Sequence, residues 1–298
     1  MFDYGIYLLV RIIISILQAL SLEQARGFAL FMAWLCADVL HVRAKLVREN
    51  IAHAFPTLSP EQVHEVERGM WRHLFFMLME AAFAERKIHL SNWKQYVSLE
   101  NEAAPLQAMY EGRPLIYALG HLGNFEFAGY ILGLIGIPPY TVARTLDNPH
   151  LNQYLLNFRN STGQYIIPKD AAAPMLEEAM ERGHSAAILM DQHAGPKGFW
   201  VTYFGREAST HKVIPLLARS FHASVAVSAP FRKDEKLFHF HIVTANFFTP
   251  EALMEGNSPK EAAQILNTTL ENLVRREPHQ YWWLHNRWKP RKKSATKS

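Results

Sequence analysis

The 298-residue sequence predicts an α/β fold, in which a largely parallel mixed sheet is flanked by helices and preceded by an N-terminal helical, membrane-proximal segment. Beyond about residue 90, short apolar runs alternate with stretches of helical periodicity, which is typical of parallel sheets. Hydrophobic residues make up 49% of the chain, enough for a large core. The expected strands are Tyr96–Leu99, Leu115–Leu119, Tyr140–Val142, Tyr165–Ile167, Ser185–Met190, Ala223–Ala229 and Leu237–Val243. The expected helices between and after them are Ala103–Glu111, Asn124–Ile135, Pro149–Ser161, Ala172–Arg182, Lys212–Phe221 and Pro259–Arg276.

The first 90 residues predict helices only. Ser21 with Gln24 forms a capping-box pattern that starts a second helix, and Ser59 before Pro60 starts a long helix that runs to about residue 86. A polar amphipathic helix over residues 43–54 lies between them. We therefore expect apolar membrane-associated helices over residues 1–40, one α/β domain over residues 41–291 whose helical cap spans 41–90, and a basic tail over residues 292–298.

The apolar run Tyr4–Leu20 carries a single charge, Arg11, at its middle. A secretory signal has its charge before the apolar region and small residues after it, so this run is expected to be retained. The cost of a central arginine nearly cancels the gain from the apolar residues. A short membrane span and a helix lying in the membrane interface both remain open.

The net charge of +4 is concentrated at the C-terminus, and the rest of the chain carries a net charge of −2. A broad nucleic-acid-binding surface is therefore excluded. Three tryptophans near these charges predict either an anchor at the membrane interface or closure of the core, with Trp283 inside. Cys36 is expected to be a small core residue, and a lone cysteine fits a reducing compartment. The tryptophans are Trp282, Trp283 and Trp288, and the basic residues are Arg287, Lys289, Arg291, Lys292, Lys293 and Lys297.

The stretch Leu115–Glu126, which reads LIYALGHLGNFE, predicts a buried strand, a tight turn and the start of a helix. His121 would lie at the mouth of the sheet as a general base, with Glu126 one helical turn on to orient its ring. No G-x-S-x-G motif supplies a nucleophile, so the substrate would bring its own hydroxyl. A metal site would need a third ligand. The alternative to a catalytic role is that His121 is a purely structural histidine at a helix start.

Further polar residues are candidates for substrate binding. Arg144 or Arg159 could stabilise an oxyanion or grip a phosphate, and spacing does not choose between them. Asp191 and Gln192 end a buried strand, where they could hold substrate hydroxyls or shape the loop. Arg206, Ser209, Thr210 and Lys212 predict an anion site at a helix start, against a plain N-cap.

The motif GHLGNFE resembles the His-x4-Glu/Asp motif of the lysophospholipid and glycerolipid acyltransferase superfamily. Within it, the chain looks like the lipid A biosynthesis late acyltransferases, which are the lauroyl and myristoyl transferases, over roughly residues 110–290. The further stretches that carry this resemblance are ARTLDNPHLNQYLLNFRNSTG, LMDQHAGPKGFWVTYFG, GREAST and YWWLHNRWKPR.

The resemblance implies transfer of a fatty acyl chain from acyl carrier protein, or acyl-CoA, to a hydroxyl of a lipid A precursor. His121 matches the catalytic base and Glu126 its carboxylate partner, and Asn124 joins the substrate-binding residues. No metal or cofactor is implied, and the expected location is the cytoplasmic face of a bacterial inner membrane. His121→Ala or Glu126→Ala should abolish transfer and leave the protein folded.

Several alternatives stay open. The acceptor could be another glycolipid, such as a mannosylated phosphoinositide, or a lysophospholipid. Water could replace the hydroxyl, which would make the protein a thioester hydrolase. A non-enzymatic lipid-binding membrane protein would need neither His121 nor Glu126.

Overall fold

The computed structural model describes residues 2–169 and 172–291. Its N-terminal part is helical, as predicted, and both expected helix starts are confirmed. Ser21 and Gln24 form a complete capping box, and so do Ser59 and Gln62, with Pro60 at the first helical position. The helices are α1 (Phe2–Ala19), α2 (Leu22–Trp34), which continues into a π-helical turn (Leu35–Val39), α3 (Ala44–Ala54) and α4 (Pro60–Lys87).

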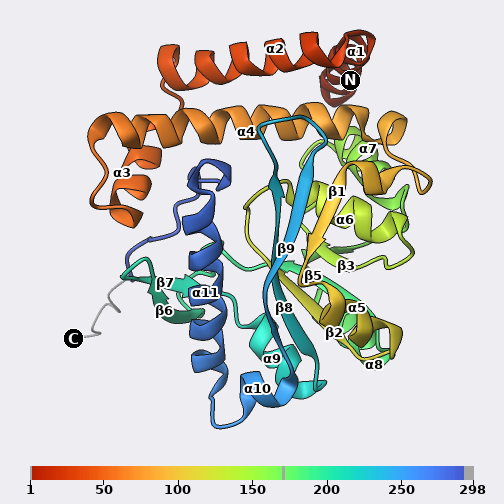
Figure 1. The fold of residues 1–298 in the computed structure, drawn as a ribbon, viewed down its shortest axis with the longest axis vertical. Helices are drawn as coiled ribbons and strands as arrows, with labels where there is room; N and C mark the ends of the chain where they lie inside the picture. The colour runs from red at the N-terminus through yellow and green to blue at the C-terminus, as the bar shows by residue number, and fades with distance from the viewer. Residues whose placement is uncertain (1, 170–171, 292–298) are drawn as a thin grey trace.

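The sheet has seven strands in the order β1-β9-β8-β2-β5-β3-β4. Neighbouring strands run parallel except β8 and β9, which are antiparallel, so the predicted α/β fold with a largely parallel sheet is confirmed (Figure 1). The strands are β1 (Val97–Glu100), β2 (Leu115–Leu119), β3 (Tyr140–Ala143), β4 (Tyr165–Pro168), β5 (Ser185–Leu189), β8 (Ser224–Arg232) and β9 (Phe240–Phe248).

Helices cover both faces of this sheet, which makes its central strands fully buried. The helices α9 (Val213–Ser220) and α11 (Pro259–Arg276) pack on one face, while α5 (Ala103–Tyr110) and α6 (Phe125–Leu134) pack on the other. The remaining helices near the β3–β4 edge are α7 (Pro149–Asn160) and α8 (Ala172–Glu181). All five residues of β2 are buried, as a central parallel strand requires.

Two elements were not predicted, and one strand is displaced. An antiparallel hairpin joins β6 (Phe199–Tyr203) to β7 (Arg206–Thr210) through Phe204 and Gly205, which both have positive φ. Such a turn is usually signalled by Asn-Gly or Asp-Gly, and that signal is missing here. A short helix, α10 (Pro250–Met254), was also missed. The last strand starts at Phe240 and not at Leu237, because a turn over residues 233–239 extends the connection from β8.

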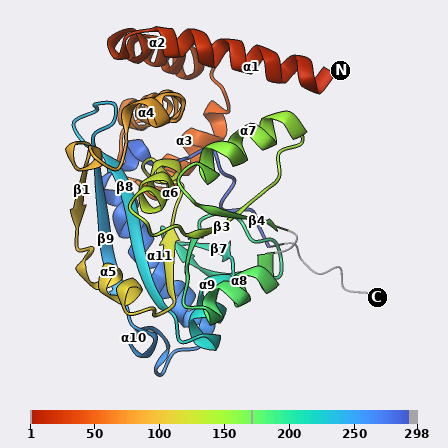
Figure 2. The same cartoon turned by 90° about the vertical axis from the view of Figure 1, so that its right-hand side faces the viewer.

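Helix α4 separates the sheet from the N-terminal helices. Figure 2 shows α1 and α2 on the outer side of α4, away from the strands. Three contacts along the length of α1 hold this helix against the body of the protein. The Asn148 side chain donates to the Asp3 carbonyl oxygen (2.8 Å), the Arg11 guanidinium lies 4.8 Å from the Tyr154 ring centre, and Gln18 donates to the carbonyl oxygen of Ala82.

The C-terminal segment is part of the core. Trp283 and Trp288 are buried, which confirms core closure and rules out an interface anchor made by these two rings. Arg287, one of the basic residues counted near the C-terminus, is 2% exposed and belongs to the interior. Its guanidinium donates to the Ser209 carbonyl oxygen and the Thr210 hydroxyl, groups that only the unpredicted hairpin brings to it. Residues 292–298 of the expected tail lie outside the described residues.

Candidate active site

The register of two neighbouring parallel strands builds the centre of the site. Leu119 of β2 pairs with Leu189 of β5, and the ladder continues where Met190 donates its N–H to the Leu119 carbonyl oxygen (2.9 Å). Two residues beyond each strand end stand His121 and Asp191. Parallel strands present their carboxyl ends at one edge of the sheet, where sites of α/β proteins form.

Asp191 holds His121 through two hydrogen bonds. The His121 N–H donates to Asp191 Oδ2 (2.8 Å), and the ring Nδ1 lies 2.7 Å from Oδ1. The two residues are 7% and 0% exposed. Burial alone would raise the pKa of Asp191, but the adjacent His121 ring and its hydrogen bonds outweigh burial and hold that pKa well below its usual range.

This geometry fixes the tautomer of the His121 ring. An ionised carboxylate only accepts hydrogen bonds, so Nδ1 carries the proton and Nε2 keeps its electron pair. With this tautomer the Gln192 side-chain amide donates to Nε2 (3.3 Å) and occupies the place that an acceptor hydroxyl would take. His121 can therefore act as a base at Nε2, while Asp191 stabilises the ring once it becomes charged.

The expected contact between Glu126 and the His121 ring is wrong. Glu126 accepts two hydrogen bonds from Arg159, at 2.6 and 3.0 Å. Glu126 lies on the first turn of α6 and points to Arg159 of α7, whereas the neighbouring Phe125 is the residue of α6 that packs against the His121 ring. Gly123 has a φ of +61°, and a Cβ there would lie 2.0 Å from the Pro230 carbonyl oxygen.

The side chain of Asn124 is used inside the protein, which differs from the expected contact with substrate. Its oxygen accepts from the Phe127 N–H (3.0 Å) and caps α6, and its nitrogen donates to Glu80 (2.7 Å). Glu80 is fully buried and forms an ion pair with Arg232. Asn124 is 2% exposed, so its role in this structure is to fix the start of α6.

The structure distinguishes the two candidate arginines. Arg144 lies on the surface, where it pairs with Asp147, and its side chain is 77% exposed. The Arg159 side chain is 14% exposed and reaches the first turn of α6 through its pair with Glu126. Only Arg159 is therefore brought next to the turn that carries His121.

The predicted anion site at a helix start is not formed. Ser209 and Thr210 are strand residues of β7 with buried side chains, and their hydroxyls bond to the Gly195 carbonyl oxygen and to Arg287. Helix α9 has Lys212 as its N-cap residue without a side-chain cap. Arg206 is exposed in the hairpin, one residue past its turn. The unpredicted hairpin places Arg206, Ser209 and Thr210 in a strand, apart from Lys212 at the start of α9.

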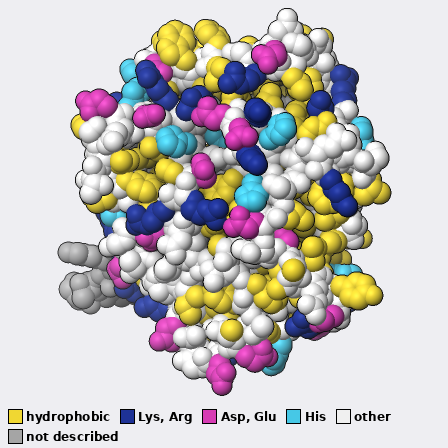
Figure 3. All heavy atoms as spheres, viewed as in Figure 1, with side chains coloured by type: hydrophobic (Ala, Val, Ile, Leu, Met, Phe, Trp, Pro, Cys, Tyr) yellow, Lys and Arg dark blue, Asp and Glu magenta, His cyan; other side chains and the backbone are white. Residues whose placement is uncertain are grey.

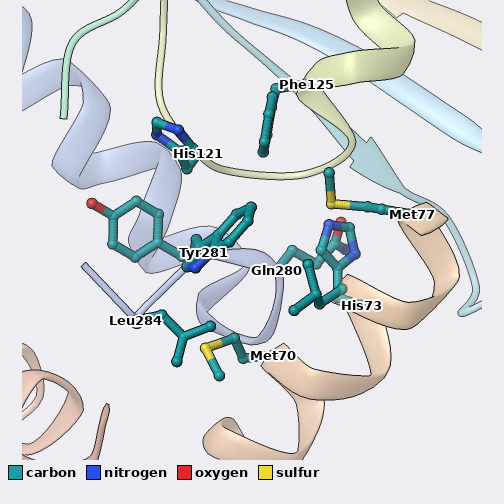
Figure 4. Close-up of a pocket in the computed structure, with 10 residues that line it drawn as sticks. Met70, His73, Met77, His121, Phe125, Gln280, Tyr281 and Leu284 are labelled. Carbon is teal, nitrogen blue, oxygen red and sulfur yellow. The ribbon is translucent and has the colours of Figure 1, made fainter. Parts of the chain in front are cut away.

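An apolar pocket opens beside His121. Figure 4 shows His121 and Phe125 on one side of it, and Met77 and His73 from α4 on the other. The cavity has a volume of only about 10 Å³, which is room for about one water molecule. Its remaining lining residues are Met70, Leu74, Gln280, Tyr281, Trp282 and Leu284.

A polar groove adjoins this pocket, and His73 and Gln280 line both. Figure 3 shows side chains of both charges gathered with histidines in the upper half of this face, over α4 and the β8–β9 connection. Burial and the nearby Arg232 lower the pKa of His73 to about 3, so its ring is neutral. His73 and Gln280, the two residues shared by the pocket and the groove, are therefore both uncharged.

Sequence reasoning placed Asp191 among the substrate-binding residues and missed that it orients the histidine. The available signal was its position directly after a buried strand that neighbours the strand before His121. Arg287, His73 and His285 near the site carried no spacing signal. Over residues 2–169 and 172–291, no group of three or more histidine, cysteine, aspartate or glutamate residues has an arrangement that could hold a metal ion.

The chain is similar to known proteins over most of its length. The profile of a family described as bacterial lipid A biosynthesis acyltransferase matches residues 1–290. The lipid A biosynthesis palmitoleoyltransferase of Escherichia coli K12 is 25% identical over 256 residues, which is 84% of this chain and 79% of the relative. The lipid A biosynthesis lauroyltransferase of the same strain is 24% identical and covers 84% of this chain and 80% of its own length. A lipid A biosynthesis acyltransferase of Haemophilus influenzae is 24% identical, with 79% and 72% covered.

Proposed function

The chain belongs to the bacterial lipid A biosynthesis acyltransferase family, and we propose that it transfers a fatty acyl chain from a thioester to a hydroxyl of a lipid A precursor. The donor would be acyl carrier protein or acyl-CoA. The activities for which its relatives are named support the acceptor class, and the arrangement of His121 with Asp191 supports the chemistry. The enzyme is an acyltransferase, which confirms the family resemblance seen in the sequence.

The reaction needs one base and no covalent enzyme intermediate. Nε2 of His121 takes the proton of the acceptor hydroxyl as its oxygen attacks the thioester carbonyl carbon. The tetrahedral intermediate then expels the thiolate, which recovers the proton from His121, so an ester and a thiol are formed. A positioned base of this kind accelerates a reaction by roughly 10²–10⁴-fold. The observation that carries this proposal is the pair of hydrogen bonds that His121 donates to Asp191, because they place the ring proton on Nδ1 and the electron pair of the base on Nε2.

We assign the Glu126–Arg159 pair to substrate positioning. Glu126 holds the guanidinium in a bidentate arrangement, which fixes its plane. Arg159 keeps donors that can bind a phosphate or the oxyanion beside the first turn of α6. In this role Glu126 acts through Arg159 and contributes to the reaction without touching His121.

We assign the part of the acyl chain next to the thioester to this apolar pocket. Its walls are methionine, leucine and aromatic side chains, and His121 contributes to the same lining. The cavity in this structure holds about one water molecule, so these side chains must move apart to admit the chain. Burying each methylene is worth about 0.8 kcal/mol, so the number of methylenes buried would set chain-length preference.

The activity test uses purified protein, labelled acyl carrier protein and acyl-CoA donors, and a panel of acceptors that includes a lipid A precursor, another glycolipid and a lysophospholipid. We expect an acylated lipid A precursor, and a loss of at least 100-fold in the His121→Ala variant. This variant should stay folded at the assay temperature, with a lowered thermal unfolding midpoint because Asp191 loses its buried partner. Free fatty acid as the main product would show a hydrolase. Equal rates for wild type and His121→Ala would overturn the mechanism.

We also propose that the protein associates with the cytoplasmic face of the bacterial inner membrane through α1 and α2. Helix α1 is long and apolar enough to cross a membrane. Its contacts with Ala82, Asn148 and Tyr154 favour a helix that lies in the interface, because crossing the bilayer would break them. The exposed apolar side chains are Phe2, Leu8, Leu9, Ile12, Ile13 and Ile16 on α1, and Phe28, Phe31 and Trp34 on α2.

Cysteine labelling distinguishes the two orientations. In a Cys36→Ala background, Phe2→Cys should react with a membrane-impermeant maleimide only after the spheroplasts are opened, since both ends of an interfacial helix stay on the cytoplasmic side. Lys94→Cys, on the exposed surface of the body, is the matched control. Labelling of Phe2→Cys alone in intact spheroplasts would show that α1 spans the membrane.

A further inference from the structure

A second imidazole lies against the ring of His121, and the mechanism above does not use it. The rings of His285 and His121 are 4.4 Å apart between centres, at an angle of 75°. On another side, the His285 ring stacks on Trp282 at 5.6 Å. His285 thus lies directly against the ring of the proposed base, although it comes from the C-terminal segment.

The backbone holds His285 in a fixed position relative to His121. The buried side chain of Asn50 in α3 donates to the carbonyl oxygens of Trp283 (2.8 Å) and His285 (2.9 Å). The Trp282 N–H donates to the carbonyl oxygen of His121 (2.9 Å). Two separate elements therefore fix the distance between the two imidazoles, as preorganised catalytic groups require.

The charge state of His285 is also fixed. Burial, followed by the neighbouring His121, lowers the pKa of His285 to about 4, so the ring is neutral near pH 7. One nitrogen of a neutral imidazole donates and the other accepts. Nε2 is buried and has no hydrogen-bond partner among the described residues, so Nδ1 is the nitrogen that a ligand can reach.

We propose that His285 contacts the reacting thioester as a neutral hydrogen-bond donor, with Nδ1–H directed at the carbonyl oxygen as it becomes the oxyanion. A neutral donor suits this place, because a charged ring would repel His121 when His121 takes the acceptor's proton. Neutral imidazole acting on a substrate carbonyl is an established catalytic device in other enzymes. This inference rests on the proposed acyl transfer and names a second group for the same reaction.

Two variants distinguish the loss of the hydrogen-bond donor of His285 from the loss of its ring shape. His285→Phe keeps a ring without a donor, and it should lower kcat about 10²–10³-fold, the usual effect of removing one oxyanion donor, with little change in KM. In His285→Asn the amide nitrogen takes the place of Nδ1, so it should recover at least tenfold over His285→Phe. His239→Phe, on the exposed β8–β9 connection, is the matched control and should keep the wild-type rate.

Binding of a non-reactive thioether analogue of the donor measures ground-state effects, and it should be the same for wild type and both variants. The proposal is overturned if His285→Phe keeps kcat within threefold of wild type. It is also overturned if His285→Asn is as impaired as His285→Phe while both bind the analogue and unfold at the wild-type temperature. His121→Ala is assayed in parallel. An active His121→Ala variant would refute the base itself, whereas an inactive one beside an active His285→Phe refutes only the role of His285.

Discussion

Two carboxylates compete for the role of partner to His121, and they differ in separation and surroundings. Glu126 lies five residues further along the chain, whereas Asp191 lies 70 residues away. Yet Asp191 bonds the histidine in the interior, and Glu126 pairs with Arg159 at a partly open position. The register of β2 and β5, and not closeness in sequence, therefore determines that Asp191 is the partner of His121.

The two pairs also differ in what their loss should cost. Both members of the His121–Asp191 pair are buried, so removal of one leaves the other without its partner in a medium of low polarity. Water reaches the Glu126 carboxylate, which is 29% exposed, and can replace part of a lost bond. The comparison therefore predicts one pair that controls the chemistry and one that positions substrate.

The largest expected effect is that of Asp191→Asn. The His121 N–H needs an acceptor, so the new amide turns its oxygen to the backbone and its nitrogen to the ring. Nδ1 must then accept, which puts the proton on Nε2 and removes the base. We expect kcat to fall about 10³–10⁴-fold, as the equivalent change does in serine proteases. Steady-state kinetics measures it, and the double variant with His121→Ala should be no slower than His121→Ala alone. Activity within tenfold of wild type would show that Asp191 does not set the tautomer.

The second effect concerns Glu126→Gln and Arg159→Gln. Each should lower kcat/KM about 10²–10³-fold, because Glu126→Gln releases the guanidinium from its fixed plane and Arg159→Gln removes it. The double variant should be no worse than each single variant, since the two residues act as one unit. A double-mutant cycle measures this coupling. Multiplicative losses would mean that Glu126 and Arg159 act separately. Full loss in Glu126→Gln with an active Arg159→Gln would return Glu126 to the reacting centre.

The smallest effect is on stability against pH. Burial keeps the pKa values of His73 and His285 at about 3 and about 4, below the usual value near 6.5. Between pH 6.5 and 4 the unfolded chain therefore binds more protons, and the free energy of unfolding falls with acid by up to about 1.4 kcal/mol per pH unit for each ring. Urea unfolding at pH 7, 6 and 5 measures the slope.

Variants at the buried His285 and at the partly exposed Glu126 should differ in how their free energy of unfolding depends on pH. His285→Asn should flatten the slope, because it removes one of the two depressed rings. Glu126→Gln changes the open pair and should keep the wild-type slope. An unchanged slope in His285→Asn would mean that its ring is already charged in the folded protein.

Local patterns in the sequence were sufficient for most of the fold. Caps at Ser21 and Ser59 and the apolar run of β2 carry their own chemistry, so their positions could be predicted without tertiary contacts. The β6–β7 hairpin could not, because its turn at Phe204 and Gly205 lacks the usual residues, and packing of its Tyr203 on Trp288 stabilises it instead. The false anion site at Ser209 followed from that missing hairpin.

By itself, the sequence determined that a histidine would follow a buried strand, that the chain contained no nucleophile motif of the serine-hydrolase type, and which family it resembles. Only the tertiary structure decided which acid orients His121, why Glu126 turns to Arg159 instead, and that Arg287 and His285 lie inside. The reason is physical. A motif specifies residues along one segment, whereas hydrogen-bond partners come from strands and helices that the fold brings together from distant parts of the chain.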